Sequence, residues 1–463
     1  MSFLVCLGAL CFLMLVAYRG FSVILFAPIA ALLAVLVTQP SDVLPVYSSL
    51  FMDKMVVFVK LYFPVFLLGA VFGKVVEISG FSKSIVSATI RLLGRQHTVI
   101  AIVLVCALLT YGGVSLFVVV FAVYPFAAEA FRISGLPKRL IPCTIALGAF
   151  TFTMDSLPGT PQIQNIIPAA FFKTNAWAAP WLGVIGATFI LICGLSYLTW
   201  RIRSAAAAGE GYGTGHTQEP EHIDERDLAN PAIAILPLIV VGATNLLFTK
   251  LVPQFFGATA TVKLPGLAAP LVTPVAPNVA IWAVELALLC GIFTVFVFAF
   301  GRVKARFAEG SKGAVAGALL ASLNTASEYG FGSVIAALPG FLAIREALAA
   351  IPNPLINEAI SVTTLAGITG SASGGMSIAL AAMANQFIAA ANAAGISPEV
   401  LHRVAAMASG GMDTLPHNGA VITLLAVTGL THRQSYKDIF AITCIKTMAV
   451  FVVIAVYYTT GIV

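Results

Sequence analysis

Two short polar segments, MDSLP at residues 154–158 and MDTLP at residues 412–416, interrupt apolar stretches of the chain. Each combines an aspartate, a hydroxyl side chain and a proline. Asp155 and Asp413 can titrate, coordinate a cation, or cap the helix that follows by accepting its free N–H groups. The prolines stop helix formation and leave backbone groups free to face a ligand. The sequence therefore predicts that both segments belong to a binding site, with capping as the alternative role of the two acids.

The residues that follow the two prolines differ. The first segment continues as GTPQ (residues 159–162) and the second as HNG (residues 417–419). Free helix N–H groups beside small hydroxyl and amide side chains suit a carboxylate and hydroxyls. Protonated His417 could pair with such a carboxylate and couple binding to pH, with packing as its alternative role. The substrate-binding residues predicted here are Ser156, Gly159, Thr160, Thr414, His417 and Asn418.

A third polar cluster lies in the stretch LLASLNTASEYGFG at residues 319–332. Its acid, Glu328, can carry a proton if it is buried, because desolvation disfavours the charged carboxylate. The alternative is a glutamate in a water-filled crevice near the cytoplasmic end. Glu285 and Lys446 are further intramembrane charges, which we expect to be structural or to lie at helix ends. The predicted proton- or cation-coupling residues are Asp155, Asp413, Glu328, His417, Asn324 and Thr325.

The chain as a whole is strongly apolar. Of its 463 residues 59% are hydrophobic and 10% are charged, and the mean hydropathy is +0.99, whereas a soluble domain carries roughly 25% charged residues. This composition indicates a polytopic membrane protein. The net charge of +6 is typical of basic loops beside an anionic leaflet and does not require a nucleic-acid partner. The seven cysteines stand singly, without metal or disulfide spacing, and are expected in the core.

A helix needs about 20 apolar residues to span a membrane. Arg19 follows the first apolar stretch instead of preceding it, which favours a membrane helix over a cleaved signal peptide. Predicted spans cover residues 2–18, 21–38, 57–78, 98–131, 176–200, 231–250, 278–300, 316–342, 355–392 and 438–461.

Two of these spans are longer than one helix needs, and each contains a glycine pair at which a helix can break. One pair lies within 98–131 and the other within 355–392, and hydroxyl side chains accompany both pairs. The substrate-binding residues predicted at these breaks are Gly112, Gly113, Ser115, Ser371, Ser373, Gly374, Gly375 and Ser377.

The segments around the two polar motifs, residues 139–173 and 399–431, each contain two apolar runs that are too short to span a bilayer alone. We predict that each segment is a re-entrant hairpin whose polar tip lies inside protein. Two ordinary spans joined by an external loop are the alternative.

Four pairs of motifs recur in the same order at an offset of about 260 residues, which indicates an internal duplication. FGKVVEISGF (72–81) matches FGSVIAALPGF (331–341), and GGVS (112–115) matches GGMS (374–377). SGLPKRL (134–140) matches GISPEVL (395–401), and MDSLP matches MDTLP.

By the count of spans, the two copies have opposite topology. Inverted repeats are typical of secondary transporters, which bind substrate near the midplane where helices are broken. We predict an all-α polytopic membrane protein with two inverted-topology repeats, broken helices and re-entrant hairpins. Its expected parts are scaffold helices at 1–56, a first repeat at 57–200, a cytoplasmic loop at 201–230, central linking helices at 231–315 and a second repeat at 316–463.

Lysine and arginine counts predict which side is cytoplasmic. The loop 201–230 and most basic residues, Arg403 among them, fall on one side of the predicted spans. That side is predicted to be cytoplasmic, so both termini are expected outside. Lys138 and Arg139 fall on the other side, against the trend.

No phosphate-binding loop, zinc-ligand pair or nucleophile–base motif occurs in the sequence. We therefore expect no cofactor and no metal site. Without an ATP site, uphill movement must draw on an ion gradient, and a membrane potential supplies about 2.3 kcal/mol per charge per 100 mV.

The strings LLGAVFGKVVEISGFSKSIVSATIRLLGRQHTVIAIVL, GGVSLFVVVFAVYPFA and GGMDTLPHNGAVITLLAVTGLTHRQSYKDIF resemble the gluconate:proton symporter family, and the last is most similar to its hydroxybutyrate-permease branch. The resemblance implies a bacterial inner-membrane symporter for small hydroxy-carboxylates. It also implies paired re-entrant hairpins, a scaffold domain, and a dimer that works by an elevator motion. Gluconate members carry a His- and Pro-rich string where this chain has TMDSLPGTPQ, which favours a less hydroxylated acid such as 3-hydroxybutyrate.

The expected function is proton-coupled symport of a small hydroxy-monocarboxylate, with 3-hydroxybutyrate favoured over gluconate-like sugar acids. Apolar neighbours of the tips, Phe150, Phe152, Leu157 and Leu415, would suit a short methyl-ended chain. One alternative keeps the fold and uses sodium. Another is a membrane-embedded enzyme with Asp155 and Asp413 as an acid pair. The expected partners are the carboxylate, the coupling ion, the lipid bilayer and a second copy of the chain.

Overall fold

The computed structural model describes residues 2–19, 21–94, 97–114, 116–216, 219, 228–341, 351–416 and 418–463. Nearly all of the regular structure is helical, and six of the described helices are long and apolar enough to cross a membrane. The fold is that of an all-α polytopic membrane protein, as the sequence predicts. The six helices that are long and apolar enough to cross a membrane span Pro40–Ile78, Pro180–Ala207, Pro231–Phe256, Val279–Ala337, Ala372–Ala393 and His432–Thr460.

The first copy begins with three apolar segments. Helices α1 (Ser2–Tyr18) and α2 (Val23–Thr38) pack against each other. The third segment is one long helical path without a break, formed by η1 (Pro40–Asp42), α3 (Val43–Pro45), η2 (Val46–Phe51) and α4 (Met52–Ile78). The expected boundary between a scaffold at 1–56 and a repeat at 57–200 therefore falls inside a helix.

Helices α6 (Thr98–Tyr111) and α7 (Leu116–Ile133) form a hairpin, called hairpin 1 below. The hydroxyls of Thr98 and Ser134, at the open ends of the two arms, are hydrogen-bonded at 3.1 Å. The turn lies at Gly112 and Gly113, where Gly113 has a φ of +95° that favours glycine. An arm of 14 residues is about 21 Å long and does not cross a bilayer.

Helices α15 (Pro354–Thr369) and α16 (Ala372–Ala393) form the equivalent hairpin 2. Its arms pack closely, because a Cβ placed on Gly375 would lie 2.2 Å from the Cα of Ala366. The turn lies at Gly370, which has a φ of +66°. Gly374 and Gly375 lie inside α16, so the prediction that this pair breaks the helix is wrong. Their role is close contact between helices.

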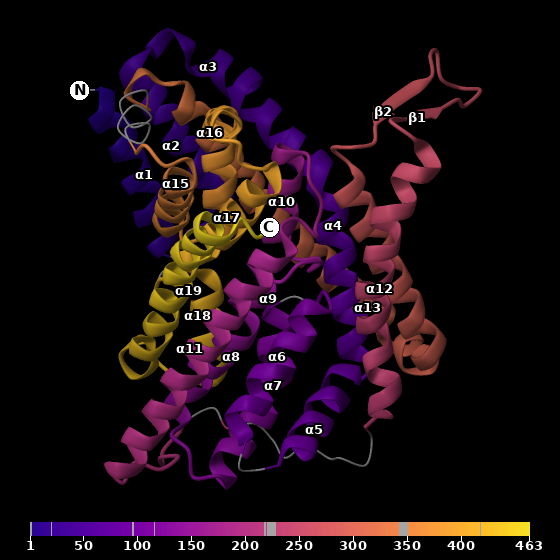
Figure 1. The fold of residues 1–463 in the computed structure, drawn as a ribbon, viewed down its shortest axis with the longest axis vertical. Helices are drawn as coiled ribbons and strands as arrows, with labels where there is room; N and C mark the ends of the chain where they lie inside the picture. The colour runs from indigo at the N-terminus through magenta and orange to yellow at the C-terminus, as the bar shows by residue number, and fades with distance from the viewer. Residues whose placement is uncertain are drawn as a thin grey trace.

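The segments predicted as hairpins have another shape. Residues 139–173 form η4 (Lys138–Leu140), α8 (Ile141–Ala149), α9 (Phe152–Asp155) and α10 (Ile163–Phe172), and residues 399–431 form α17 (Pro398–Gly411) and α18 (Gly419–Thr428). In Figure 1, α8 lies below α9 and α10 lies above it, and α17 lies above α18. Each segment is one crossing with an unwound middle, because its arms lie end to end. The hairpins are the neighbouring spans 98–131 and 355–392.

The unwound crossings run in opposite directions, which gives the two copies inverted topology. The face that carries the start and end of the 201–230 linker lies at the lower end of Figure 1 and is called the linker face. The first crossing rises from that face to α10, after which α11 (Pro180–Ala207) descends. The second crossing descends from α17 to α18, after which α19 (His432–Thr460) rises.

The second copy begins with α12 (Pro231–Phe256) and α13 (Val279–Ala337), which are joined by a two-stranded antiparallel ribbon, β1 (Thr259–Val262) and β2 (Leu271–Pro274). The ribbon is an addition to the predicted all-α fold, in the Pro-rich stretch 251–277. Helix α13 has one non-helical residue, Ala299. Residues 301–315, predicted as part of a linker, remain helical because they are rich in good helix formers and contain no proline. The expected boundary at 315/316 therefore falls inside α13.

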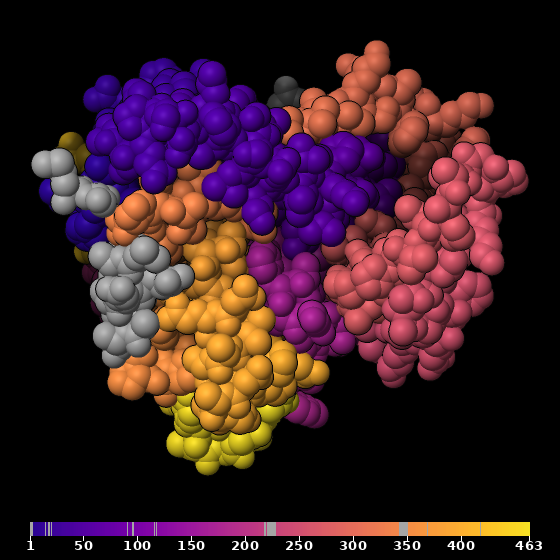
Figure 2. All heavy atoms as spheres, turned by 90° about the horizontal axis from the view of Figure 1, so that it is seen from above, coloured from indigo at the N-terminus to yellow at the C-terminus, as the bar shows by residue number. Residues whose placement is uncertain are grey.

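Helix α4 and the second half of α13 are equivalent in the two copies and run antiparallel. Gly310 lies against Lys74, whereas Gly330 lies against Phe51. This antiparallel pair holds the two copies together. Seen from above in Figure 2, the indigo helices of the first copy and the rose to salmon helices that begin the second copy form the upper and right edges, and the orange and yellow helices form the lower left.

The structure corrects the register of the repeat at the hairpins. Helix α7 begins at Leu116 and α16 begins at Ala372, an offset of 256 residues. The offset between Met154 and Met412 is 258. The alignment of GGVS with GGMS has an offset of 262 and is therefore out of register, because the counterpart of the first glycine pair is the turn at Gly370.

A charge network closes the linker face. The buried carboxylate of Asp438 on α19 accepts from Arg139 at 2.9 Å, Arg201 at 2.5 Å and Tyr197 at 2.7 Å. Lys138 pairs with Glu219 of the linker. Lys138 and Arg139 therefore lie on the side of the linker, contrary to the prediction, because span 98–131 is a hairpin that returns to its starting face.

Arg403 was predicted at the linker face but lies away from it, because span 355–392 is also a hairpin that returns to its starting face. Helix α17 starts at the upper end in Figure 1, and Arg403 is fully buried within it. At the linker face itself, the hydrogen-bonded Arg139 guanidinium lowers the pKa of the Glu210 carboxyl. Lys138, Arg139 and Arg201 therefore lie together at the linker face.

Replacing Gly375 by alanine tests the packing of hairpin 2. The new methyl group overlaps the backbone of Ala366, and overpacking of this kind costs about 2 kcal/mol of unfolding free energy. Gly317→Ala is the matched control, since no atom lies within 4 Å of its added Cβ on α13. We expect a lower melting temperature in detergent for Gly375→Ala only. Equal melting of both variants would contradict close packing of the arms.

Replacing Asp438 by alanine tests the network at the linker face. The change leaves the guanidiniums of Arg139 and Arg201 without their buried carboxylate, which costs about 3 kcal/mol. Glu309→Ala removes an exposed acid and is the control. We expect the melting temperature in detergent to be clearly lower for Asp438→Ala than for Glu309→Ala. A stability of Asp438→Ala like that of the control would show that the network does not hold the face closed.

Candidate functional site

The candidate site is built from the unwound middles of the two crossings, residues 156–162 and, among the described residues, 412–416 and 418. The first is unwound by Pro158 and Pro161 and by Gly159, which has a φ of +78°. A Cβ on Gly159 would also lie 2.3 Å from the ring of Trp177. Only glycine fits there. The second contains Pro416 and ends at Asn418, whose side chain caps α18.

Each unwound segment is tied to the hairpin turn of its own copy. Gln162 donates its amide to the Thr110 carbonyl at 2.7 Å, and the Tyr111 hydroxyl donates to the Pro158 carbonyl at 2.8 Å. In the second copy, Asn418 donates to the Gly370 carbonyl at 2.6 Å. These equivalent bonds satisfy backbone groups that lack helical partners. The Asn418 amide both caps α18 and holds the hairpin turn, so it has a structural role beside its predicted role as a substrate ligand.

A lysine connects the two unwound regions. Lys446 of α19 is buried, with 1% of its surface exposed. Its ammonium forms an ion pair with Asp413 and also donates to the Phe150 carbonyl, at 3.2 Å, in the first crossing. The sequence prediction placed Lys446 among structural residues or helix ends. The structure places it between the two predicted tips.

Asp155 is buried without an ion pair among the described residues. Ser156 donates its hydroxyl to the Asp155 carboxylate at 2.6 Å. The other carboxylate oxygen lies 1.9 Å from the position of a Cβ on Gly410, so α17 can approach it only through glycine. Asp155 is within electrostatic range of Lys446, Asp413 and Arg403. Two acids and two bases of the repeats thus share one buried region.

The second base, Arg403, fastens the first crossing to α17. It donates to the Asp155 carbonyl at 2.9 Å, to the Asn165 side chain at 3.1 Å and to the Ala178 carbonyl at 2.8 Å. Its neighbour His402 lies 2.6 Å from the Thr174 hydroxyl. All these acceptors come from the first copy, so Arg403 positions the carboxylate-bearing segment.

The polar cluster around Glu328 lies where α13 meets hairpin 2. The Glu328 carboxylate lies 1.6 Å from the position of a Cβ on Gly374, and Ser371 is its neighbour. Ser373 lies 3.3 Å from the Thr325 hydroxyl, and Ser377 donates within its own helix. Glu328 therefore belongs to the contact between scaffold and hairpin and is not on either unwound segment.

Several buried polar atoms have no hydrogen-bond partner in the part of the chain that the structure describes. Such atoms are costly unless a ligand or water satisfies them. The hydroxyls of Thr110 and Thr160 lie on hairpin 1 and on the unwound segment tied to it. The other unpartnered atoms that bear on the site are Gln164 Oε1, Asn324 Oδ1, the Ser327 hydroxyl and Glu328 Oε2.

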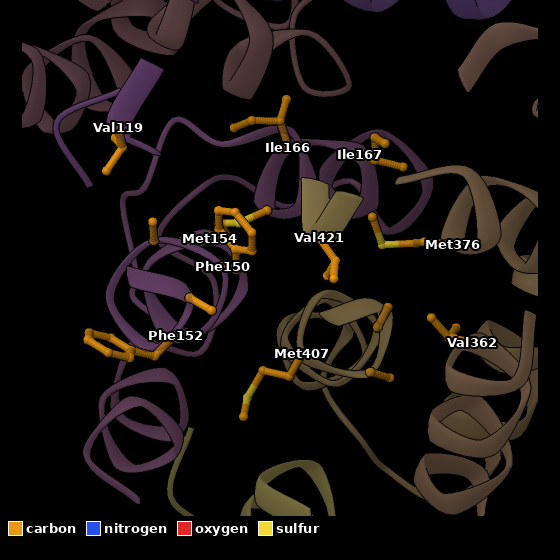
Figure 3. Close-up of a cluster of buried hydrophobic side chains, with 14 of the residues drawn as sticks. Val119, Phe150, Phe152, Met154, Ile166, Ile167, Val362, Met376, Met407 and Val421 are labelled. Carbon is orange, nitrogen blue, oxygen red and sulfur yellow. The ribbon is translucent and has the colours of Figure 1, made fainter. Parts of the chain in front are cut away.

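Apolar side chains from both copies surround the unwound segments. Figure 3 shows Phe150, Met154 and Ile166 of the first copy facing Val421 and Met376 of the second. These side chains are buried. Phe152 is also buried, whereas Leu157 and Leu415 are partly exposed. Buried apolar side chains of the two copies therefore pack together in this region.

The two equivalent regions differ in exposure. All residues from Phe150 to Ser156 are buried. In the second region Met412 exposes 37% of its surface. Met154 is thus covered by protein, whereas its counterpart in the second copy, Met412, is exposed.

The structure brings together several predicted residues: Asp155 with Ser156, Asp413 with Thr414, and Gly112 and Gly113 with the Gly159 and Thr160 segment. Thr414 pairs its hydroxyl with that of Thr443 at 2.6 Å. Glu328, Asn324, Thr325, Ser371 and Ser373 form a separate cluster. His417 and Ser115 lie outside the described residues. Within the described part of the chain, no group of three His, Cys, Asp or Glu side chains could hold a metal ion.

Sequence reasoning did not assign Arg403 and Lys446 to the site. Both are charges in apolar helices of the second copy, and neither has a counterpart at the equivalent position of the first copy. The absence of a counterpart in the first copy was the sequence signal that could have assigned both residues to the site. A third residue, Glu358, is fully buried in α15 with both carboxylate oxygens unpartnered among the described residues. Glu285 is half-buried on α13.

No family model matches the chain. A curated relative from Bacillus subtilis (strain 168), described as the uncharacterized transporter YxjC, is 57% identical over 472 residues, which cover 100% of both chains. The chain belongs to this transporter family. It is therefore a membrane transporter and not an enzyme. Asp413 is paired with Lys446, which also argues against a proton-sharing aspartate pair. A solved YdaH transporter of Alcanivorax borkumensis is similar over 91% of this chain and 90% of that chain, with 15% identity and a TM-score of 0.49.

Replacing Thr160 by valine tests whether the unpartnered hydroxyls face a ligand. The change removes no hydrogen bond within the described structure, so the melting temperature of the transporter should hold or rise. A lost ligand bond should raise the KM for uptake of the labelled substrate by about threefold to tenfold.

Thr144→Val is the control for this prediction, because the Thr144 hydroxyl is buried but donates to the Leu140 carbonyl at 2.8 Å. It should lower stability by about 1 kcal/mol and leave the KM unchanged. An unchanged KM in Thr160→Val would remove Thr160 from the binding site.

Proposed function

We propose that this transporter carries a small hydroxy-monocarboxylate across the bacterial inner membrane together with protons. The observation that carries the proposal is the meeting of two oppositely directed unwound crossings around Asp155, Asp413, Arg403 and Lys446. Broken helices of inverted repeats are where secondary transporters bind their substrates. The unpartnered hydroxyls of Thr110 and Thr160 offer ligands for a carboxylate or hydroxyl group.

The substrate we favour is 3-hydroxybutyrate, with gluconate-like sugar acids next. The resemblance of the sequence to hydroxybutyrate permeases supports this choice. The buried apolar neighbours of the first tip, Phe150 and Phe152, also support it, because apolar neighbours suit a methyl-ended chain better than a polyol.

For proton coupling we favour Asp155. It is buried, it accepts a hydroxyl hydrogen bond, and no cation contacts its carboxylate directly within the described residues. Proton-relay acids in membrane proteins commonly face the interior of a helix bundle in this way. Its Coulombic neighbours of both signs can make its charge sensitive to a bound carboxylate.

Sodium coupling is the second candidate, and one observation favours it. The carbonyl oxygen of the Asn324 side chain, the Ser327 hydroxyl and one Glu328 oxygen are all buried and unpartnered among the described residues. Oxygen atoms of these types are suited to a hard monovalent cation. Replacing sodium by choline at fixed pH distinguishes this candidate from proton coupling.

Transport by alternating access requires the two related halves to open one at a time. The buried Met154 and its exposed counterpart Met412 are consistent with such a state. We propose an elevator movement of the hairpins and crossings against the pair α4 and α13, and a homodimer. The basic residues gathered at the linker face favour that face as cytoplasmic and both termini as periplasmic.

Uptake into proteoliposomes tests the proposed function. With a pH gradient that is alkaline inside, we expect labelled 3-hydroxybutyrate to accumulate above its external concentration. Replacing sodium by choline should not change the accumulation. Asp155→Asn should abolish gradient-driven accumulation and retain exchange of labelled for unlabelled substrate, because it removes the proton and keeps the shape of the site.

Glu309→Gln, on an exposed part of α13, is the control and should transport like the wild type. Accumulation that follows a sodium gradient and ignores the pH gradient would overturn proton coupling. Uptake of no hydroxy-carboxylate would overturn the substrate class.

A further inference from the structure

The ammonium of Lys446 occupies a place where a metal cation could bind. It lies between a carboxylate of one unwound segment, Asp413, and the Phe150 carbonyl of the other crossing. Carboxylates and unwound backbone carbonyls are the groups with which discontinuous membrane helices coordinate sodium. The position therefore has the chemistry of a monovalent cation site, and a side chain fills it.

Further hydroxyl and carbonyl oxygens belong to residues that flank Asp413 and Lys446. The Thr447 hydroxyl donates to the Gly411 carbonyl at 2.7 Å, directly before the unwound segment. On the other side of Asp413, Thr414 and Thr443 pair their hydroxyls at 2.6 Å. Removing the lysine side chain would leave a negative carboxylate among neutral oxygens in a buried space.

The first copy lacks this arrangement. Asp155 is equivalent to Asp413 in the repeat, and Ser156 is its donor instead of a cation. Helix α11, which is equivalent to α19, contains no charged residue from Pro180 to Trp200. Among the described residues, Asp155 interacts electrostatically with Lys446, with Asp413 and with Arg403 of α17, which is bound to acceptors of the first copy. Asp413 is thus the carboxylate that carries its own tethered cation.

We infer that Lys446 is a built-in substitute for a monovalent metal ion at Asp413, and that without its ammonium this site would take Na⁺ or Li⁺. The ammonium is monovalent like these ions and cannot leave the protein. It excludes a mobile cation from this half of the site and leaves the equivalent carboxylate, Asp155, without one. For its consequence in transport, this inference rests on the proposed function, since it makes the wild type independent of sodium at Asp413.

The experiment is a thermal-shift titration of the full chain in detergent with NaCl, LiCl or choline chloride at equal ionic strength. The wild type should melt at the same temperature in all three salts. Lys446→Ala should melt about 2 °C or more higher in sodium or lithium than in choline, because an ion that binds only the folded state stabilises it. Lys446→Arg keeps the charge and should show no such response.

The double variant Asp413→Asn with Lys446→Ala is the matched control. It removes both charges, so it should fold in every salt and lose the response to sodium. Equal melting of Lys446→Ala in sodium and choline would overturn the inference. Failure to recover folded Lys446→Ala in sodium would also overturn it, because no metal ion would then replace the ammonium. So would a sodium response of the wild type that Asp413→Asn abolishes.

This outcome is separate from that of the proposed function. The thermal shift needs no substrate, so it can support the tethered cation even if no hydroxy-carboxylate is transported. Where uptake is observed, Lys446→Ala should become dependent on sodium.

Discussion

Broken backbone inside a membrane must find new partners, and this constraint explains the main polar contacts of the candidate site. Unwinding residues 156–162 and 412–418 frees carbonyl and amide groups that water cannot reach. Gln162 and Asn418 satisfy hairpin carbonyls, and Lys446 and Arg403 satisfy the carbonyls of Phe150 and Asp155. Each unpaired group would cost several kcal/mol in the hydrocarbon region. The two copies are therefore held together by the groups that make the site possible.

The inverted repeat supplies the framework, and the differences between the copies supply the chemistry. Equivalent parts of the two copies make equivalent contacts: each hairpin turn meets its own unwound segment, and α4 meets its counterpart in α13. The two buried bases of the candidate site, Arg403 and Lys446, come from the second copy. Because Arg403 and Lys446 both reach into the first crossing, a movement of one copy's helices changes the surroundings of the other copy's acid. Coupling between ion and substrate needs a connection of this kind.

The sequence predicted where most of the membrane helices lie. It did not predict which of them pair as hairpins. Hydropathy located α1 and most crossings, and the repeated MD(S/T)LP motif located both unwound segments. Which segments fold back could not be read from span length, because a broken crossing and a hairpin have the same pattern of two short apolar runs. The hydrogen bond of Thr98 to Ser134, 36 residues apart, decides that point for hairpin 1. Arg403 and Lys446 were invisible for a related reason: their partners are backbone carbonyls, which no residue type reveals.

The distinction between satisfied and unsatisfied polar atoms narrows the candidate site further than residue type can. Asn418, Thr414 and Ser377 have the right chemistry for a substrate, yet each already has a partner that the fold needs. Thr110 and Thr160 are no more polar, and their hydroxyls have none among the described residues. A buried hydroxyl without a partner weakens the empty protein, so it persists only where something else compensates it. In a transporter the bound substrate can supply the missing hydrogen bond. Its binding must remain weak enough for release on the other side.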